Sequence, residues 1–326
     1  MDDTDRKLLM LIAAEPRIHS RELAQRLGIS KQTVQQRMQI LTMKGVLRGI
    51  TAGISIFYLD AVYVLVFGKS NTTSIEDTLD RLGESELTHG VIVAGGNFLY
   101  VRGLLRNISE LNNYGEFVRR AAEMPTPTVG IFDFDVGIMP DYVDGARRKK
   151  SYKELTALDL RIIASLKNSV RRPVADIADA IGVSVKTVRR RLNDMISEGS
   201  LDFFAPLDLV PDEDMFTLMH VNLREGANKE EVGRRLFAKY PHQTLYIRSF
   251  SNLPNFLLCT FCSDKMAEIH KVLRMIGEDE DVLAAVPDHL YHERIYSTWL
   301  DKLPAALGCP SRKTGTRSTR FEPKMR

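Results

Sequence analysis

The spacing of apolar residues in the first fifty positions predicts three short helices. An apolar stripe with helical spacing begins at Leu8, and Pro16 ends this first helix. Two more helices are predicted over residues 21–27 and 31–44, separated by a short turn that contains Gly28. Two helices joined by such a turn form a helix-turn-helix, so the sequence predicts this arrangement at the start of the chain.

The residues after the third helix predict a small wing. The segment over residues 46–55 is rich in branched side chains and has a turn residue at Gly53. A hairpin at this position would complete a winged helix-turn-helix domain over residues 1–55.

The third helix has hydrogen-bonding side chains on the side opposite its apolar stripe. Amides such as those of Gln35 and Gln36 suit adenine edges, and guanidinium groups suit guanine or phosphate. On one helix alone, such a face is more typical of solvated surface. Its recurrence on a second capped helix favours contact with DNA. The predicted DNA-binding residues are Ser30, Lys31, Gln32, Thr33, Gln35, Gln36, Arg37, Ser184, Lys186, Thr187, Arg189, Arg190 and Arg191.

The chain repeats itself. A shift of 154 positions places Asp5 on Asp159 and Gly28 on Gly182, and the match needs no gap over residues 5–47. A repeat of this size duplicates a whole architecture, not a single element. The sequence therefore predicts two copies of one unit, each beginning with a helix-turn-helix.

Strand and helix patterns follow each helix-turn-helix in the order β-α-β-β-α-β. The last strand of the first copy alternates apolar and polar residues, and the last strand of the second is less clear, over residues 290–299. This order is typical of the ferredoxin-like topology, so the predicted fold class is α+β with two tandem copies. The predicted domains are winged helix-turn-helix 1–55, ferredoxin-like 56–138, basic linker 139–154, winged helix-turn-helix 155–207, ferredoxin-like 208–303 and a disordered basic tail 304–326.

Charge follows the same division of the chain. The net charge of +3 divides into +13 on the helix-turn-helix segments, linker and tail and −10 on the ferredoxin-like segments. Such segregation directs a positive field toward one side and favours double-stranded DNA as the partner there. Three cysteines cannot form a disulfide framework, and no apolar run approaches the roughly 18 residues of a membrane span. We therefore expect a cytoplasmic protein that has no membrane partner.

Two cysteines have the spacing of a metal or redox pair. Cys259 and Cys262 lie inside a predicted strand, where positions three apart point to opposite faces. A second pair that could complete four ligands is missing from the sequence. We expect neither a metal site nor a cofactor.

The first helix-turn-helix carries a family resemblance. The segment ELAQRLGISKQTVQQRMQILTMKGVLRG, after DDTDRKLLMLI and before the β-α-β-β-α-β region, resembles the Lrp/AsnC family of prokaryotic transcription regulators. Asp2, Asp5 and Leu9 and the Leu-Gly-Ile-Ser turn are its more specific parts. The resemblance covers nearly the whole chain and implies a sequence-specific DNA-binding regulator on the nucleoid. Family members usually contain one such unit, whereas this chain contains two.

The resemblance also implies partners. Family units pair through their ferredoxin-like domains, which implies a pseudo-dimer within this chain, with a homodimer of chains as a further level. Many family members bind an amino acid or another small effector near the turn between the second and third strands. That turn is Gly95, Gly96 and Asn97 in the first copy. The second copy has Leu253 and Pro254 at the first two positions, which does not favour a second site.

One enzyme class remains as the alternative. Siroheme decarboxylases are similar to the Lrp/AsnC family in both modules, and their chemistry would require a histidine facing a large pocket in a ferredoxin-like domain. His89 and His220 are the candidates, although nothing in the sequence marks either of them as catalytic. The basic third helices favour a regulator that is not an enzyme.

Overall fold

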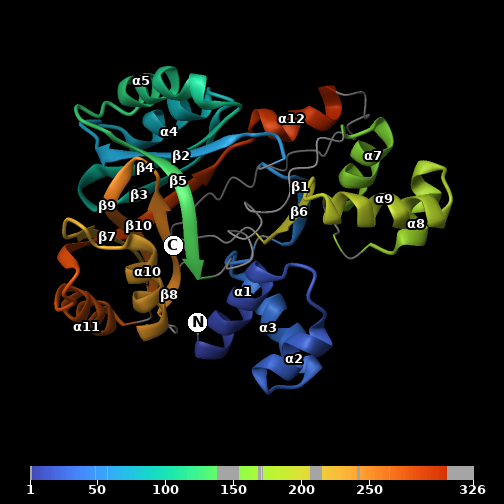
Figure 1. Cartoon of the computed structure of the whole chain (residues 1–326), viewed down its shortest axis with the longest axis horizontal. Coiled ribbons are helices and arrows are strands. Elements are labelled where there is room, and N and C mark those ends of the chain that lie inside the picture. The colour runs from blue at the N-terminus through green and yellow to red at the C-terminus, as the bar shows by residue number, and fades with distance from the viewer. Residues whose placement is uncertain are drawn as a thin grey trace, which may run out of the picture.

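The computed structural model describes residues 2–47, 49–56, 58–137, 154–167, 170, 172–205, 215–240, 243–263 and 265–306 (Figure 1). Two helical heads lie beside a barrel of strands that is covered by helices. Within these ranges, each helix is too short or too polar to cross a membrane.

Each head contains the three predicted helices around its own apolar core. In both heads the middle helix ends at a glycine with left-handed backbone, Gly28 (φ 66°) and Gly182 (φ 71°). The helix-turn-helix prediction is therefore confirmed in both copies. Head 1 comprises α1 (Asp3–Ala14), α2 (Ser20–Leu27) and α3 (Lys31–Met43), and head 2 comprises α7 (Ala157–Leu166), α8 (Val174–Ile181) and α9 (Val185–Ser197).

The β-α-β-β-α-β order is also confirmed in both copies. The first copy contains β2 (Val62–Lys69), α4 (Ile75–Gly83), β3 (Thr88–Ala94), β4 (Phe98–Leu105), α5 (Leu111–Ala121) and β5 (Thr128–Gly137). Short 3₁₀ turns η1 (Gly95–Asn97) and η2 (Ile108–Glu110) precede β4 and α5. The second copy contains β7 (Met215–Leu223), α10 (Lys229–Lys239), β8 (Thr244–Phe250), β9 (Leu253–Ser263), α11 (Met266–Gly277) and β10 (Val282–Ile295).

The two ferredoxin-like sheets join into one closed barrel in the order β10-β3-β4-β2-β5-β8-β9-β7. The last strand of each copy makes the join. Strand β5 pairs with β2 and then with β8, and β10 pairs with β7 and then with β3. Helices α4 and α5 cover one side of the barrel, and α10 and α11 cover the other (Figure 1). Each copy thus completes the sheet of the other.

The predicted end of the second copy was wrong in detail. Strand β10 begins at Val282, earlier than the predicted residues 290–299, because its first half pairs with β7. The strand ends at Ile295, and Trp299 starts a further helix, α12 (Trp299–Ala306), that lies between the barrel and head 2 (Figure 1). Apart from Glu154 and the last turn of α12, the predicted linker 139–154 and tail 304–326 lie outside the described residues.

The predicted hairpin wing at Gly53 was wrong. Gly53 lies inside a single strand, β1 (Thr51–Ile54), whose partner is β6 (Leu201–Phe204) of the second copy. The physical reason is burial, because Ala52 and Ile54 of β1 insert into the apolar core of head 2. The segment therefore connects the heads.

The barrel strands separate two kinds of core. One face of each sheet packs against helices, and the other faces the barrel interior, where aromatic rings of both copies meet. Cys259 belongs to the helix-facing cluster and Cys262 to the interior cluster. The prediction that these two cysteines point to opposite faces is confirmed.

Candidate nucleic-acid interface

The recognition helices α3 and α9 begin in the same way. The side chain of Ser30 accepts a hydrogen bond from the backbone N–H of Thr33 (3.0 Å), and Ser184 does so from Thr187 (3.1 Å). The two hydroxyls of each pair also lie 2.8 and 2.9 Å apart. These four predicted DNA-binding residues therefore define where each helix starts.

Two predicted DNA-binding arginines form intramolecular ion pairs instead of projecting freely. Arg37 bonds Asp2 (2.8 Å) and Asp5 (2.7 Å), which cap the start of α1. Arg191 bonds Asp159 (2.7 Å), which has the same capping position in α7. These contacts fasten each recognition helix to the first helix of its head. The sequence repeats an aspartate and an arginine 32 positions apart in both copies, but the repeat by itself does not indicate a contact.

The remaining predicted side chains are exposed. On α3 they lie away from Val34 and Leu41, which are buried in the core of head 1. On α9 they lie away from the buried Val188, Leu192 and Met195. The exposed set is Lys31, Gln32, Gln35 and Gln36 on α3, and Lys186, Arg189 and Arg190 on α9.

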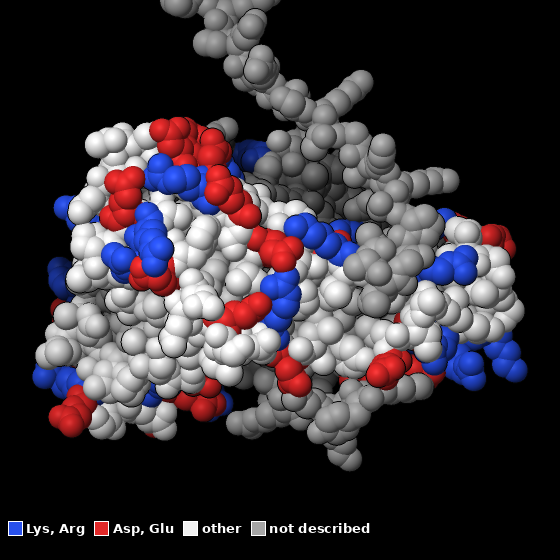
Figure 2. Space-filling view, turned by 90° about the horizontal axis from the view of Figure 1, so that it is seen from above, with Lys and Arg blue, Asp and Glu red and all other residues white. Residues whose placement is uncertain are grey.

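Charge is distributed differently over the heads and the barrel. On the helical layer above the barrel, acidic and basic side chains lie next to each other, and at the end of the molecule that holds head 2 Lys and Arg project outward with some acidic residues beside them (Figure 2). On that layer Glu116, for example, bonds both Arg119 (2.7 Å) and Arg120 (2.6 Å). Neutralised pairs give little field at a distance, so the paired charges of this layer contribute little to the field around the molecule.

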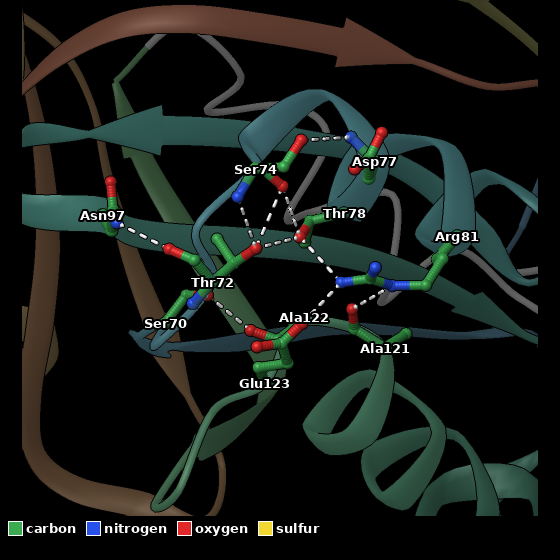
Figure 3. Close-up of polar contacts among 10 residues, drawn as sticks. All are labelled: Ser70, Thr72, Ser74, Asp77, Thr78, Arg81, Asn97, Ala121, Ala122 and Glu123. Atoms are coloured by element: carbon green, nitrogen blue, oxygen red, sulfur yellow. Dashed lines mark hydrogen bonds and ion pairs between the residues drawn. The ribbon is translucent and has the colours of Figure 1, made fainter.

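The predicted effector turn lies at η1, between β3 and β4. Gly95 and Gly96 are exposed, and an added Cβ at either would meet no atom within 4 Å. The side-chain amide of Asn97 donates to the carbonyl oxygen of Thr72 (3.2 Å), and Ser70 donates to Ala122 O (2.6 Å) (Figure 3). The loop between β2 and α4 therefore supports this open turn.

In the second copy the predicted equivalent residues Leu253 and Pro254 lie inside β9, and the turn between β8 and β9 is Ser251 and Asn252, which is exposed and bonded to β5. The side chain of Asn252 accepts a hydrogen bond from Ile131 N (2.8 Å) and donates to Val129 O (2.7 Å), both on β5. Ser251 N also donates to Ile131 O (2.8 Å). Both turns are exposed, but the second is fastened to the last strand of the first copy.

A polar cluster in the barrel interior links the two copies. His220 of β7 lies 2.6 Å from the hydroxyl of Tyr100 on β4, and this hydroxyl also bonds Asp288 of β10. Burial lowers the pKa of His220, and Asp288 opposes this effect. Rings of Phe67 and Phe256 pack edge-on against the imidazole at 5.5 and 5.4 Å. The sequence offered His220 only as a histidine that could face a pocket, and Tyr100 and Asp288 lie too far from it in the chain to be linked with it.

The second candidate histidine also faces the interior. His89 lies 3.4 Å from the hydroxyl of Tyr63, and burial, together with the positive charges of Arg102 and Arg248, lowers its pKa to about 4. Arg102 forms a buried ion pair with Glu293 of β10. His89 is therefore neutral at physiological pH.

Comparisons with known proteins identify both heads. Residues 1–48 match a winged helix-turn-helix DNA-binding family, and residues 155–196 match the AsnC-type helix-turn-helix domain. The HTH-type transcriptional regulator Ptr1 of Methanocaldococcus jannaschii is 27% identical over 149 residues, which span 45% of this chain and 97% of Ptr1. The chain therefore carries two helix-turn-helix domains in tandem, of which the second is of the AsnC type.

One solved structure shares the tandem architecture over nearly the whole chain. The siroheme decarboxylase NirDL superposes with a TM-score of 0.57 at 18% identity, covering 94% of this chain and 99% of NirDL. This likeness concerns the fold alone. A transcriptional regulator of Neisseria meningitidis in complex with L-Met matches with a TM-score of 0.38 at 20% identity, covering 46% of the tandem chain and 99% of that regulator.

Proposed function

We propose that this tandem protein is a sequence-specific DNA-binding transcription regulator on the prokaryotic nucleoid, whose two heads contact one duplex. The observation that supports this proposal best is the pair of capped recognition helices with exposed amide and basic side chains. Capped helices of this kind enter the major groove and place their exposed residues against bases and phosphates.

The two heads differ in how they would contact DNA. Gln35 and Gln36 suit hydrogen bonding to adenine edges, whereas Arg189 and Arg190 suit phosphates or guanine. We infer that head 1 contributes more to sequence discrimination and that head 2 contributes more to binding of the backbone. An operator with unequal half-sites is the expected partner.

Footprinting and salt titration test this division. We expect Gln35→Ala/Gln36→Ala to weaken preferred sites by about 1–3 kcal/mol per lost base contact while leaving random duplex unaffected. The Arg189→Ala/Arg190→Ala variant should weaken all duplexes and reduce the salt dependence, because each lost phosphate contact lowers its slope by about one.

A surface arginine of the barrel provides the matched control. Arg234 on α10 is exposed and pairs with Glu230, so Arg234→Ala removes a charge outside the heads. We expect this variant to bind as the parent does. Equal loss of sequence preference in the two head variants would contradict the division of labour. Failure of the parent chain to bind any duplex would contradict the function itself.

We further propose that a small effector, such as an amino acid, binds at the turn Gly95–Asn97. Its exposure and the absence of nearby atoms around Gly95 and Gly96 support this position. Titration of amino acids against the chain, with Gly96→Val as the variant, provides the test. Binding that the variant leaves unchanged would place the effector elsewhere.

A tetrapyrrole enzyme is the second candidate function. The whole-chain fold likeness to NirDL and the interior cluster of His220, Tyr100 and Asp288 favour it. Rings of Phe67, Phe250 and other aromatic residues pack together in the interior, so a macrocycle would have to displace them. We therefore place the enzyme second.

A visible absorption spectrum distinguishes the two functions. Siroheme or haem added to the purified chain should show unchanged bands if the chain is a regulator alone. Shifted bands that disappear in His220→Phe, but persist in a variant of the exposed His270, would support the enzyme.

A further inference from the structure

Strands β1 and β6 join the two heads directly. Four consecutive residue pairs, from Thr51 opposite Phe204 to Ile54 opposite Leu201, form an antiparallel ladder. The hydroxyl of Thr51 also donates to the carbonyl oxygen of Lys167 at the end of α7 (2.5 Å). A shift of one head against the other would break these backbone bonds.

Side chains interlock around this ladder. Ala52 and Ile54 of the first copy are only 2% and 5% exposed because they lie in the core of head 2. In return Ala205, just after β6, packs against the core of head 1. The guanidinium carbon of Arg17 lies 4.9 Å from the centre of the Phe203 ring, a cation–π contact between the copies.

Each head also contacts the barrel. In head 1, Met10 and Ala13 of α1 pack with the apolar cluster of the barrel interior. Head 2 contacts α12, where Leu300 packs on the head and the indole N–H of Trp299 donates to Leu104 O of β4 (2.8 Å). The heads are thus held to each other and to a common support.

We propose that the β1–β6 ladder fixes the separation and orientation of the two recognition helices, so that the chain selects DNA by the spacing of its half-sites. This inference rests on the proposed function and adds a second criterion, spacing, to base contacts. Arg17 and Phe203 act as positioning residues, since they stabilise the ladder from outside.

The register of the ladder also sets the orientation of the heads. When the chain is shifted by 154 positions, Ile50 of the first copy falls on Phe204 of the second. Thr51 therefore lies opposite the counterpart of the residue that precedes it in the chain. With the repeat shift of 154 positions, β6 corresponds to residues 47–50 and not to β1 itself, but the antiparallel direction of the ladder is compatible with an approximate two-fold axis between the heads. The two half-sites should therefore be inverted with respect to each other.

A distance measurement tests the ladder without DNA. Gln39 and Asn193 hold equivalent, exposed positions late in α3 and α9, so cysteines there can carry spin labels in a full-length chain with Cys309→Ser. We expect one narrow distance distribution, which broadens in Phe203→Ala. A broad distribution in the parent chain would overturn the proposal.

A spacing series then tests the consequence for DNA. In a duplex selected by the parent chain, a five-base-pair insertion between the half-sites turns one of them to the other side of the helix, since a turn takes about 10 base pairs. We expect binding to fall at least tenfold for the parent chain and less than threefold for Phe203→Ala.

The control variant is Arg26→Ala, because Arg26 forms its ion pairs with Glu15 and Glu22, both within head 1. It should retain the parent's tenfold loss. A parent chain that tolerates the insertion would overturn fixed spacing while leaving DNA binding intact. A parent chain that binds no duplex would contradict the proposed function, and the spin-label distances would still decide whether the ladder fixes the heads.

Discussion

The two heads share one construction but differ in their surroundings. In each, an arginine of the recognition helix pairs with an aspartate that caps the first helix. In head 1 the Arg37 side chain is 27% exposed and Asp5 is 17% exposed. In head 2 the values for Arg191 and Asp159 are 14% and 1%. The arginine–aspartate pair is thus present in both heads, but it is more deeply buried in head 2.

Helix α12 adds to this difference. It packs on α7 through Leu300 and Leu303, and Asp301 bonds Lys167 (3.1 Å). Among the described residues, head 1 has no equivalent helix, since its contacts with the barrel come from α1. We infer that head 2 is the more firmly anchored head. The comparison shows that a repeat conserves internal contacts more readily than external ones.

Removal of the Trp299 side chain should produce the largest difference in stability between the two heads. Trp299 is 9% exposed, stacks under Arg106 and bonds Leu104 O, so Trp299→Ala should cost about 3 kcal/mol. Hydrogen exchange of the full chain should become faster in α7–α9 and stay unchanged in α1–α3. The milder Trp299→Phe serves as the control. Equal acceleration in both heads would show that α12 does not anchor head 2 selectively.

Replacing the capping aspartates by asparagine should produce the next largest difference in stability between the two heads. Asp159→Asn leaves Arg191 with a weaker partner in a mostly buried site, at a cost of about 3 kcal/mol. The matched Asp5→Asn affects a more exposed pair and should cost about 1 kcal/mol. Limited proteolysis in increasing urea, with fragments assigned by mass spectrometry, measures both. The opposite order would refute the burial argument.

The anchoring also predicts a response to acid. Burial opposes ionisation of Asp159, but hydrogen bonds from Arg191 and Thr156 outweigh it and lower its pKa. Because the folded pKa lies below the unfolded value of about 3.9, this stabilisation is complete above that pH and is lost as pH falls through the folded pKa. Emission of Trp299, the single tryptophan, should stay constant down to about pH 4 and then change. An identical profile in Asp159→Asn would exclude this aspartate as the cause.

The smallest expected effect concerns the ion pair between α12 and head 2. Lys167 and Asp301 are 48% and 41% exposed, so Lys167→Ala should change head 2 stability by less than about 0.5 kcal/mol. Lys302→Ala, which removes the Glu86 contact, is the matched control. Thermal unfolding followed at Trp299 detects the change. A larger loss of stability would mean that this ion pair, and not apolar packing, holds α12 against head 2.

The helices and strands could be predicted from the sequence more accurately than the contacts between them. Apolar spacing and capping residues such as Ser30 are local, so both heads and the β-α-β-β-α-β order were predictable. The pairing of β1 with β6 was not predictable, because Ala52 and Ile54 are buried in the core of the other copy, far away in the sequence. The same limit applies to the candidate interface: the spacing that exposes Gln35 also placed Arg37 near the exposed face, and only the fold shows its aspartate partners.

The pairing of the last strand of each copy with the other copy has a consequence for synthesis on the ribosome. Strand β3 pairs on its outer side with β10, which ends at Ile295, and β5 pairs on its outer side with β8, so the first copy is made with both sheet edges unpaired. Unpaired edges invite association with other chains, and nascent chains emerge at about 5–20 residues per second. Edge strand β3 must therefore wait roughly ten seconds or more until β10 has been made. Chaperone dependence of the nascent chain should end only when β10 has emerged.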